Sequence, residues 1–332
     1  MEICYPSYYT QFRCVAADCP DSCCKDWAVQ IDPQTAACYR ALPGVLGDTL
    51  RSSMEVQDGD TVLTLNSDGR CPMWRSDGLC RIQAALGEGA LSQVCRNFPR
   101  LRHDYGNFVE LGLELSCPEA AHMILSQTDD AYVRQSVSGG EPPEYDAEAM
   151  EILLQGRTQL LSILQQFPPQ QALAVMLLHG YHVQSQLDGA EVSVFSPEAA
   201  LAEAMSLAQP GAVEDILCFY KGLEILTDKW LQQLSTPQGS AWSQQHLALA
   251  RYGVQRYYLQ AVSDFDLIGR IKMIIVSCLV VKAVGGDIVD TAQRYAKEIE
   301  NDWDNVDAIL NATYTHTAFT DVKLLGLLFS DR

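Results

Sequence analysis

The sequence has no apolar run long enough to cross a bilayer as a helix. Its most apolar stretch, MIIVSCLVV at 273–281, is flanked by basic residues at 270, 272 and 282, whereas a transmembrane helix needs about 20 apolar residues. The amino-terminal letters MEICYPSYYTQF also lack the basic start and continuous apolar segment of a secretory signal. We therefore expect a cytoplasmic protein with no membrane partner, in a compartment that keeps thiols reduced.

Basic residues are scarce. The chain has 23 lysines and arginines against 42 acidic residues, a formal net charge of −19. Such an excess of negative charge repels phosphate backbones, so we expect no nucleic-acid partner. The charge suits a lysine-rich protein partner, but simple solubility accounts for it as well.

Several motifs of common cofactor sites are also absent. There is no C-x-x-C pair, which a zinc ribbon would show twice, and there is no bacterial ferredoxin run. No glycine-rich loop follows a predicted strand and opens a helix, so a dinucleotide-type loop is not predicted. If there is a metal site, its ligands must converge from distant segments of the chain.

The sequence does have cysteine, concentrated in its first part. Ten of the twelve cysteines lie at or before Cys117. A chain of 332 residues with 48% apolar residues can bury a core without disulfides, and a reducing compartment disfavours them. Clustered thiols in such a compartment indicate a zinc or iron–sulfur site. The predicted ligands lie in two short runs and one later position: Cys14, Cys19, Cys23, Cys24, Cys71, Cys80, Cys95 and Cys117.

The number of metal sites is open. Eight cysteines against four ligands per cluster or zinc ion allow two sites, or one site with four supporting thiols, and we favour one. Side chains of adjacent residues point in different directions on a strand or a helix, so Cys23 and Cys24 can ligate one ion only through a turn. We predict that one of them faces the metal and the other does not. The other four cysteines are interpreted as ordinary buried or surface thiols: Cys4, Cys38, Cys218 and Cys278.

The patterns predict a mainly α protein. An irregular, cysteine-rich amino-terminal part contains a few short strands, expected at 61–66 and 108–115, and two short helices within 80–100. A polar segment with Gly-Gly and Pro-Pro at 128–146 predicts the joint. We therefore expect a metal-binding domain at 1–127 and an all-helical domain at 146–332. Helices are predicted at 147–167, from 197 onward, and at 212–234, 242–262, 266–284, 287–300, 303–313 and 320–329.

Three stretches resemble the flagellin lysine-N-methylase family, which belongs to the cysteine-cluster proteins of zinc- or iron-chelating type. They are FRCVAADCPDSCCKDWAVQID at 12–32, CPMWRSDGLCRIQAALGEGALSQVCRNFPR at 71–100 and SCPEAA at 116–121. A weaker match, AQRYAKEIENDWDNVDAIL at 292–310, extends the resemblance over nearly the whole chain.

The resemblance implies an enzyme that transfers a methyl group from S-adenosylmethionine to lysine side chains of flagellin or a similar surface protein. It also implies an iron–sulfur cluster, 4Fe–4S in type, with zinc as the alternative. The attacking lysine must first lose its proton, so a carboxylate or an aromatic pocket should adjoin it. Each candidate taken singly is more often a solvated acid or a core ring. The candidates near the cysteines are Asp26, Asp32, Glu110, Glu114, Glu119, Tyr8, Tyr9, Trp27 and Trp74.

Two functions of other classes remain. One is a metal- or cluster-binding protein without methylase activity, and the other is a zinc-stabilised interaction module whose helices dock a partner. Bound S-adenosylmethionine would separate the enzyme from both, and the identity of the metal would separate these two from each other. His179 and His182 share a predicted helix face, but a core or surface pair is favoured over a ligand pair.

Overall fold

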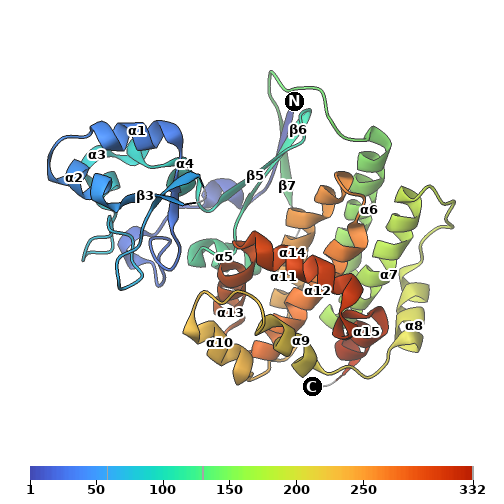
Figure 1. The fold of residues 1–332 in the computed structure, drawn as a ribbon. Helices are drawn as coiled ribbons and strands as arrows, with labels where there is room; N and C mark the ends of the chain where they lie inside the picture. Colours follow the sequence, from blue (N-terminus) through green and yellow to red (C-terminus); the bar gives the residue numbers. More distant parts are fainter. Residues whose placement is uncertain (58, 129–130, 331–332) are drawn as a thin grey trace.

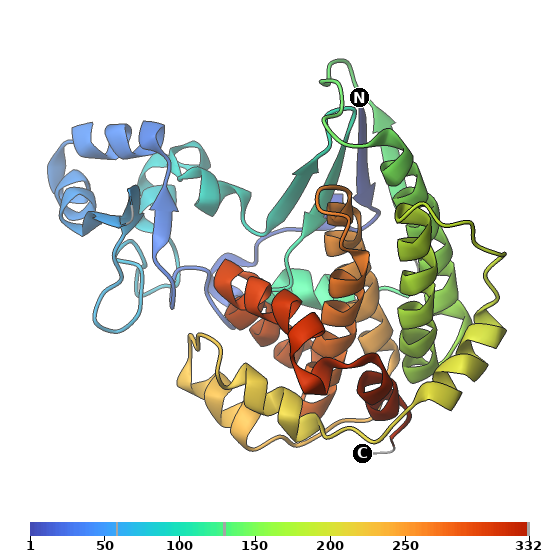
Figure 2. The ribbon, with the colours of Figure 1, turned by 45° about the vertical axis from the view of Figure 1, so that its right-hand side comes forward.

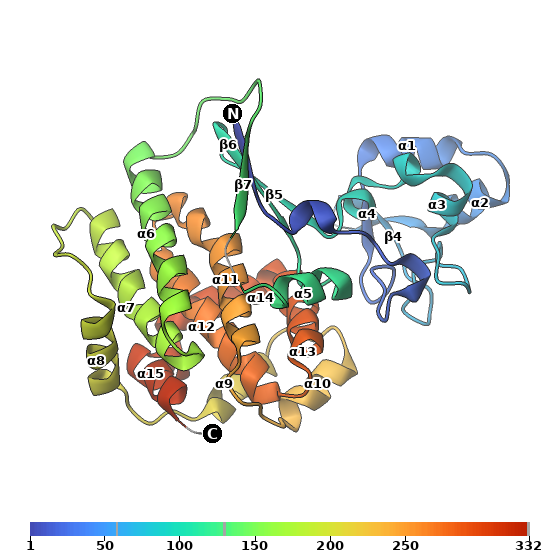
Figure 3. The ribbon, with the colours of Figure 1, turned by 180° about the vertical axis from the view of Figure 1, so that it is seen from behind.

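The structure is a computed structural model that describes residues 1–57, 59–128 and 131–330. A small amino-terminal lobe projects from a larger helical part in all three ribbon views (Figure 1, Figure 2 and Figure 3). A four-stranded sheet packs on the helical part, and the chain runs between this sheet and the lobe. The amino terminus lies in this sheet, and α15 (Asp321–Phe329) lies at the opposite end of the helical part (Figure 1).

The small lobe has a three-stranded antiparallel sheet in the order β2-β4-β3 and several short helices. Asp32 caps its first helix, since its Oδ1 accepts from the Thr35 N–H at 2.9 Å, and proline follows at the first helical position. The lobe has its own core around Ile31, Leu50 and Met73. Its elements are β2 (Val29–Ile31), α1 (Pro33–Ala41), α2 (Gly44–Ser53), β3 (Met54–Gln57), β4 (Asp60–Leu63), α3 (Arg81–Leu86) and α4 (Gln93–Asn97).

The four-stranded sheet has the order β5-β6-β1-β7. The first strand of the chain lies inside it, parallel to β6 and antiparallel to β7. The segment at 128–146, predicted as a joint, therefore contributes the edge strand β7. The strands are β1 (Glu2–Pro6), β5 (Arg100–Asp104), β6 (Phe108–Leu113) and β7 (Tyr132–Ser136).

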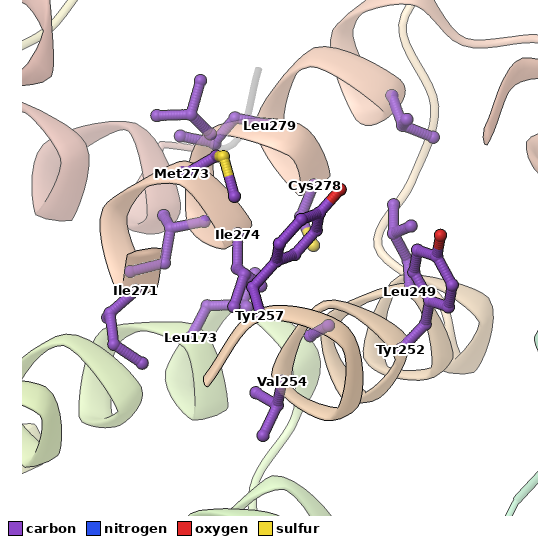
Figure 4. Close-up of a cluster of buried hydrophobic side chains, with 14 of the residues drawn as sticks. Leu173, Leu249, Tyr252, Val254, Tyr257, Ile271, Met273, Ile274, Cys278 and Leu279 are labelled. Carbon is purple, nitrogen blue, oxygen red and sulfur yellow. The ribbon is translucent and has the colours of Figure 1, made fainter. Parts of the chain in front are cut away.

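The helical part packs around α12 (Leu267–Val284), which is buried on nearly every face. The apolar run at 273–281 therefore forms the central helix of a core. Figure 4 shows α12 side chains, among them Ile271 and Ile274, close to Tyr257 and Leu173 of neighbouring helices. No helix in the described residues is long and apolar enough to span a bilayer. The other helices are α5 (Pro118–Leu125), α6 (Ala147–Gln166), α7 (Pro169–Leu187), α8 (Pro197–Leu207), α9 (Val213–Tyr220), α10 (Asp228–Ser235), α11 (Gln244–Tyr257), α13 (Ile288–Tyr295), α14 (Trp303–Thr315) and α15 (Asp321–Phe329).

The predicted mainly α class is confirmed, and the predicted strands correspond to β4 and β6. One predicted helix, 212–234, is wrong because the chain forms α9 and α10 with a bend between them. Thr227 caps α10 through its Oγ1, which accepts from the Trp230 N–H at 3.3 Å. Glu298 accepts from the Leu226 N–H at 2.8 Å. The Thr227 cap is local, but the contact with Glu298 comes from a distant part of the chain, and such a tertiary contact can override a periodic helical pattern. Helices α1, α2 and α5 were not predicted, and α7 was predicted only as a helix shared by His179 and His182, without bounds.

Candidate functional site

The first cysteine-rich run, residues 12–32, has little regular structure. Cys23 and Cys24 lie in a turn, the one conformation in which two neighbours can share a site. The Cys23 thiol donates a hydrogen bond to the Cys24 sulfur, which raises the pKa of Cys23 and lowers the pKa of Cys24 to about 7. The two sulfur atoms therefore lie together, and which of them faces a metal stays a prediction.

Backbone hydrogen bonds join this run to the second cysteine-rich segment. The Cys71 N–H donates to the Cys24 carbonyl at 2.7 Å, and the Asp26 N–H donates to the Gly69 carbonyl at 2.9 Å. Asp26 has a φ of 73°, a left-handed conformation that residues other than glycine seldom adopt. The backbone is thus strained where the two segments meet, and such strain clusters at functional sites.

Four of the eight predicted ligands share the core of the small lobe. Cys71 is buried there, and Cys24, Cys80 and Cys95 are half-buried against the same residues. Burial, with the charges of neighbouring thiolates, raises the pKa of Cys71 to about 12 and that of Cys95 to about 11. Cys71 and Cys95 therefore keep their protons at neutral pH, and a bound metal would have to displace those protons. We name Cys24, Cys71, Cys80 and Cys95 the small-core thiols.

Of the other four predicted ligands, Cys14 and Cys19 lie near Cys117 at the edge of the helical part, and Cys23 lies beside Cys24. Cys117 immediately precedes α5 and belongs to the core of the helical part. Burial raises the pKa of Cys117 to about 11, with further contributions from the charges of Cys19 and Cys14. Cys14, Cys24 and Cys95 are all near enough to Cys23 for their charges to raise its pKa. We name Cys14, Cys19, Cys23 and Cys117 the interface thiols.

The donor chemistry of these groups fits a thiophilic metal or cluster, because each group offers four sulfur atoms. As the side chains stand, however, no three cysteine, histidine, aspartate or glutamate side chains of the described residues are placed to hold a metal ion. Binding would require side-chain rotation. Cys24, Cys80 and Cys95 are half-buried, whereas Cys71 is buried. The eight-cysteine ligand set therefore stays a prediction.

A buried lysine ties the cysteine-rich run to the helical part. Lys297 Nζ lies 2.6 Å from Asp26 Oδ2 and 3.2 Å from Asp21 Oδ2, and its side chain is 5% exposed. The same ammonium group lies 5.3 Å from the ring centroid of Trp27. Lys297 belongs to a π-helical turn, η5 (Ala296–Glu300), a conformation frequent at functional sites. Two predicted candidates, Asp26 and Trp27, thus serve as anchors for Lys297.

We expect Asp21→Asn to weaken this anchor in a pH-dependent way. Burial alone would raise the pKa of the Asp21 carboxyl, but the hydrogen bond from Lys25 and the charge of Lys297 outweigh it and hold the pKa below its ordinary value of 3.8. Such a carboxyl stabilises the folded protein above its unfolded-state pKa, and the stabilisation disappears as the pH falls through the folded-state pKa. The wild-type Tm should therefore exceed that of the variant at neutral pH, and the margin should shrink below about pH 4.

Thermal melts of both proteins across this pH range test the expectation. Asp18→Asn, which changes an exposed acid in the same run, is the matched control and should leave the Tm nearly unchanged at every pH. A margin between wild type and Asp21→Asn that persists undiminished into acid would contradict the assigned role.

A buried cluster of carboxylates, phenols and one arginine lies beside this anchor. Glu300 Oε2, at the end of η5, accepts from Tyr252 Oη at 2.6 Å and from Arg256 Nη1 at 3.1 Å. Glu114 accepts from Ser116 Oγ at 3.1 Å. Burial raises the pKa of Glu114, against the charge of Arg256. A cavity of about 10 Å³, roughly the size of one water, adjoins Glu300 and Tyr252. We name Glu114, Tyr252, Arg256 and Glu300 the Glu114–Glu300 cluster.

One glutamine connects the cluster with the cysteine-rich run. Gln293 Nε2 donates to the Ser116 carbonyl at 2.8 Å and lies 3.2 Å from Asp21 Oδ2. Since Ser116 also contacts Glu114 and precedes Cys117, the interface thiols and the Glu114–Glu300 cluster are within a few residues of each other. The sequence predicted Glu114 but not Tyr252, Arg256 or Glu300. The i, i+4 spacing of Tyr252 and Arg256 was the available signal, because it places both on one face of α11.

The other predicted carboxylates have structural partners. Asp32 caps α1 and also accepts from the Gln93 N–H at 3.0 Å. Glu110 forms a buried two-bond ion pair with Arg157, with distances of 2.5 and 2.8 Å. Glu119 lies in the first turn of α5, where a carboxylate favours the helix dipole. These three positions therefore have sufficient structural explanations.

The predicted aromatic and histidine residues mostly pack. Tyr8 is buried in the core of the helical part, and the Tyr9 ring lies 5.6 Å from that of Tyr5. Trp74 lies beneath the Arg70 guanidinium at 4.5 Å. The two histidines pack as a pair against one phenylalanine, with ring centroids at 5.0 and 5.2 Å from it: His179, His182 and Phe195.

No protein-family model and no solved structure matches the chain. Three curated proteins do. A flagellar biosynthetic protein FliU of Salmonella muenchen is 36% identical over 135 residues, which cover 37% of this chain and 77% of that protein. Lysine-N-methylases of Salmonella typhimurium and Salmonella choleraesuis show the same identity over 135 residues.

The matches cover part of the chain. The alignments cover 37% of this chain, less than the nearly complete extent that the motifs suggested. The chain spans 32% of the length of the two lysine-N-methylases. It spans 77% of FliU at 36% identity, and this extent is sufficient to assign the chain to a family. The chain belongs to the family of the flagellar biosynthetic protein FliU.

Proposed function

We propose that the protein is a lysine N-methylase that acts in the cytoplasm on flagellin or a similar lysine-bearing surface protein. The observation that carries the proposal is the 36% identity to two proteins named lysine-N-methylase and to FliU. The net charge of −19 is compatible with a lysine-bearing partner. S-adenosylmethionine is the methyl donor that we propose.

The proposed transfer is a displacement at the methyl carbon. The lone pair of the lysine nitrogen forms the new bond to carbon, the carbon–sulfur bond breaks, and its electron pair stays on the sulfur of the donor. The lysine must be neutral to attack, so a nearby base must hold its proton. Three atoms must also lie in line, which makes the reaction chiefly a problem of positioning.

Glu114 is the candidate base. Burial raises its pKa, so its carboxylate has a higher proton affinity than an ordinary glutamate. It is only half-buried, whereas Asp26, Asp32 and Glu110 are committed to Lys297, a helix cap and Arg157. Arg256 and Tyr252 would hold the neighbouring Glu300 in place rather than take part in proton transfer.

We further propose that the small-core thiols hold an iron–sulfur cluster, 4Fe–4S in type, with zinc as the alternative. An iron–sulfur cluster supplies one-electron chemistry when bound. The four thiols come from both cysteine-rich segments and meet in one small core, so their ligation would cross-link the lobe. The interface thiols would then be the supporting thiols of a single site.

Co-expression with the native flagellin tests the methylase proposal. We expect intact-mass spectra of flagellin to gain increments of one methyl group on lysines, and Glu114→Gln to reduce the rate by about 10²-fold or more, as loss of a general base does. Asp18→Asn is the control. Flagellin that stays unmodified in the presence of metal-replete protein would favour a metal-binding protein without methylase activity.

A further inference from the structure

A groove of about 580 Å³ lies where α7, α12 and α14 meet. None of its residues belongs to the thiol groups or to the Glu114–Glu300 cluster. It is lined by three aromatic rings, one carboxylate, one amide and one buried aliphatic side chain: Tyr181, Phe265, Tyr314, Asp266, Gln184 and Ile268.

All three rings are exposed to solvent. Tyr181 is 39% exposed, Phe265 is 42% exposed and Tyr314 is 61% exposed. The tyrosine hydroxyls are anchored by carboxylates, Tyr181 by Asp321 at 2.6 Å and Tyr314 by Asp266. Both phenol groups are thereby fixed while their rings stay exposed. A partner that packs on these two rings would therefore cost little side-chain conformational entropy.

The third ring is presented by a strained backbone. Phe265 has a φ of 59°, and a bulky residue in the left-handed region is an outlier. The Gln184 side chain clamps this turn from α7: its Nε2 donates to the Phe265 carbonyl at 2.9 Å, and its Oε1 accepts from the Leu267 N–H at 3.0 Å. Such a conformation persists only where surrounding contacts fix it, and it is found chiefly at ligand clamps and functional sites.

The charges around the rings favour a cation. Arg270 pairs with Asp264, and Lys272 pairs with Asp321. Asp266 accepts from the Gly269 N–H at 2.8 Å and from Tyr314, but no described residue forms an ion pair with it. Arg270 Nη1 also donates to the Asp266 carbonyl at 2.5 Å, and Lys272 Nζ lies 5.9 Å from the Tyr314 ring centroid. Three carboxylates therefore face two cations beside the rings, which leaves one negative charge in excess. An ammonium group placed there would meet both a negative charge and the electron-rich faces of the rings.

We propose that this groove docks a lysine-bearing segment of the protein substrate, with a lysine ammonium against the rings and Asp266. The identity of the partner as substrate rests on the proposed methylase function; the preference of the groove for a cation rests on its own residues. The groove would hold the flagellin chain at a position outside the reacting centre. Its contribution should therefore appear in binding and in KM, with kcat unchanged.

The test compares two variants with the wild type. Tyr314→Ala removes the most exposed ring, and Phe265→Gly removes another while relieving the left-handed strain. For each we expect the Kd for native flagellin monomer, measured by fluorescence anisotropy, to rise about tenfold, as loss of a cation–π contact can cause. The KM for methylation should rise in parallel and kcat should stay the same.

Trp303→Ala is the matched control. Trp303 is 72% exposed and lies on α14, the helix that carries Tyr314, but outside the groove. It should leave Kd and KM unchanged. Groove variants that bind flagellin as the wild type does would overturn the proposal, as would a wild-type dimer that Tyr314→Ala converts to monomer in sedimentation. If wild type binds flagellin through the groove but transfers no methyl group, the docking proposal survives and the methylase proposal fails.

Discussion

Cys71→Ser should remove most of the metal from protein purified without air. Cys71 is the most buried of the small-core thiols, and its backbone N–H is bonded to the Cys24 carbonyl at 2.7 Å. The position of Cys71 is therefore the best fixed of the four, and its loss would leave only three thiols to hold the metal. Wild-type protein should carry iron with inorganic sulfide, or else zinc, and the variant should carry less than half as much. Iron, sulfide and zinc assays on folded protein decide the result.

Cys218→Ser is the matched control, because Cys218 is exposed and lies outside both thiol groups. It should leave the metal content unchanged. Structural metal sites bind tightly. The metal hypothesis would therefore be contradicted if folded wild-type protein contained less than about half an equivalent of either metal.

The same assay separates one site from two. If the small-core thiols form a single site, Cys24→Ser should abolish metal binding, while Cys23→Ser should retain metal and lower the Tm. If Cys71→Ser and Cys117→Ser each remove about half of the metal, there are two four-cysteine sites, because each would then supply one of four ligands to its own site. That result would contradict our preference for one site with supporting thiols.

Much of the fold could be predicted from the sequence because its signals are local. The periodic apolar pattern at 147–167 predicted α6 with closely matching bounds, and the proline after Ser196 predicted the first residue of α8. The break between α9 and α10 could not be predicted, because it depends on Glu298, more than 70 residues away in the chain. Helix α5 was missed for a related reason. Its eight residues follow a predicted strand directly and are buried against α11 and α13, so that tertiary packing rather than length stabilises it.

Some features of the candidate site could likewise be predicted from the sequence, and others could not. Cysteine spacing is visible in the sequence, and so the eight thiols were identified as a set. Their division into small-core and interface groups depends on which core each side chain enters, and this follows only from the three-dimensional arrangement. Glu300 lies on a π-helical turn, and a π turn has no reliable sequence signal. The sequence therefore offered Glu114 as a candidate but not the residues that surround it.

Arg157→Met should destabilise the protein by about 3–5 kcal/mol, because it leaves the Glu110 carboxylate buried without its partner. The ion pair joins β6 to α6 through bonds of 2.5 and 2.8 Å, and its side chains are 10% and 7% exposed. An exposed ion pair contributes far less, about 0–1 kcal/mol. Denaturant unfolding gives the change in the free energy of unfolding, and Arg102→Met, in the exposed pair with Asp104, is the control.

The double variant Arg157→Met/Glu110→Leu distinguishes a buried charge from a loss of packing. If the single variant is destabilised by the unpaired carboxylate, removal of that carboxylate should restore most of the lost stability, since apolar replacement of both partners is often neutral. A double variant that is less stable than Arg157→Met would show that shape, not charge, is decisive. The result also bears on function. Glu110 lies within β6, and Glu114 directly follows the last residue of that strand, so a pair that fixes β6 also fixes the position of the proposed base. Arg157→Met should therefore lower methylation activity, and the double variant should recover it together with stability.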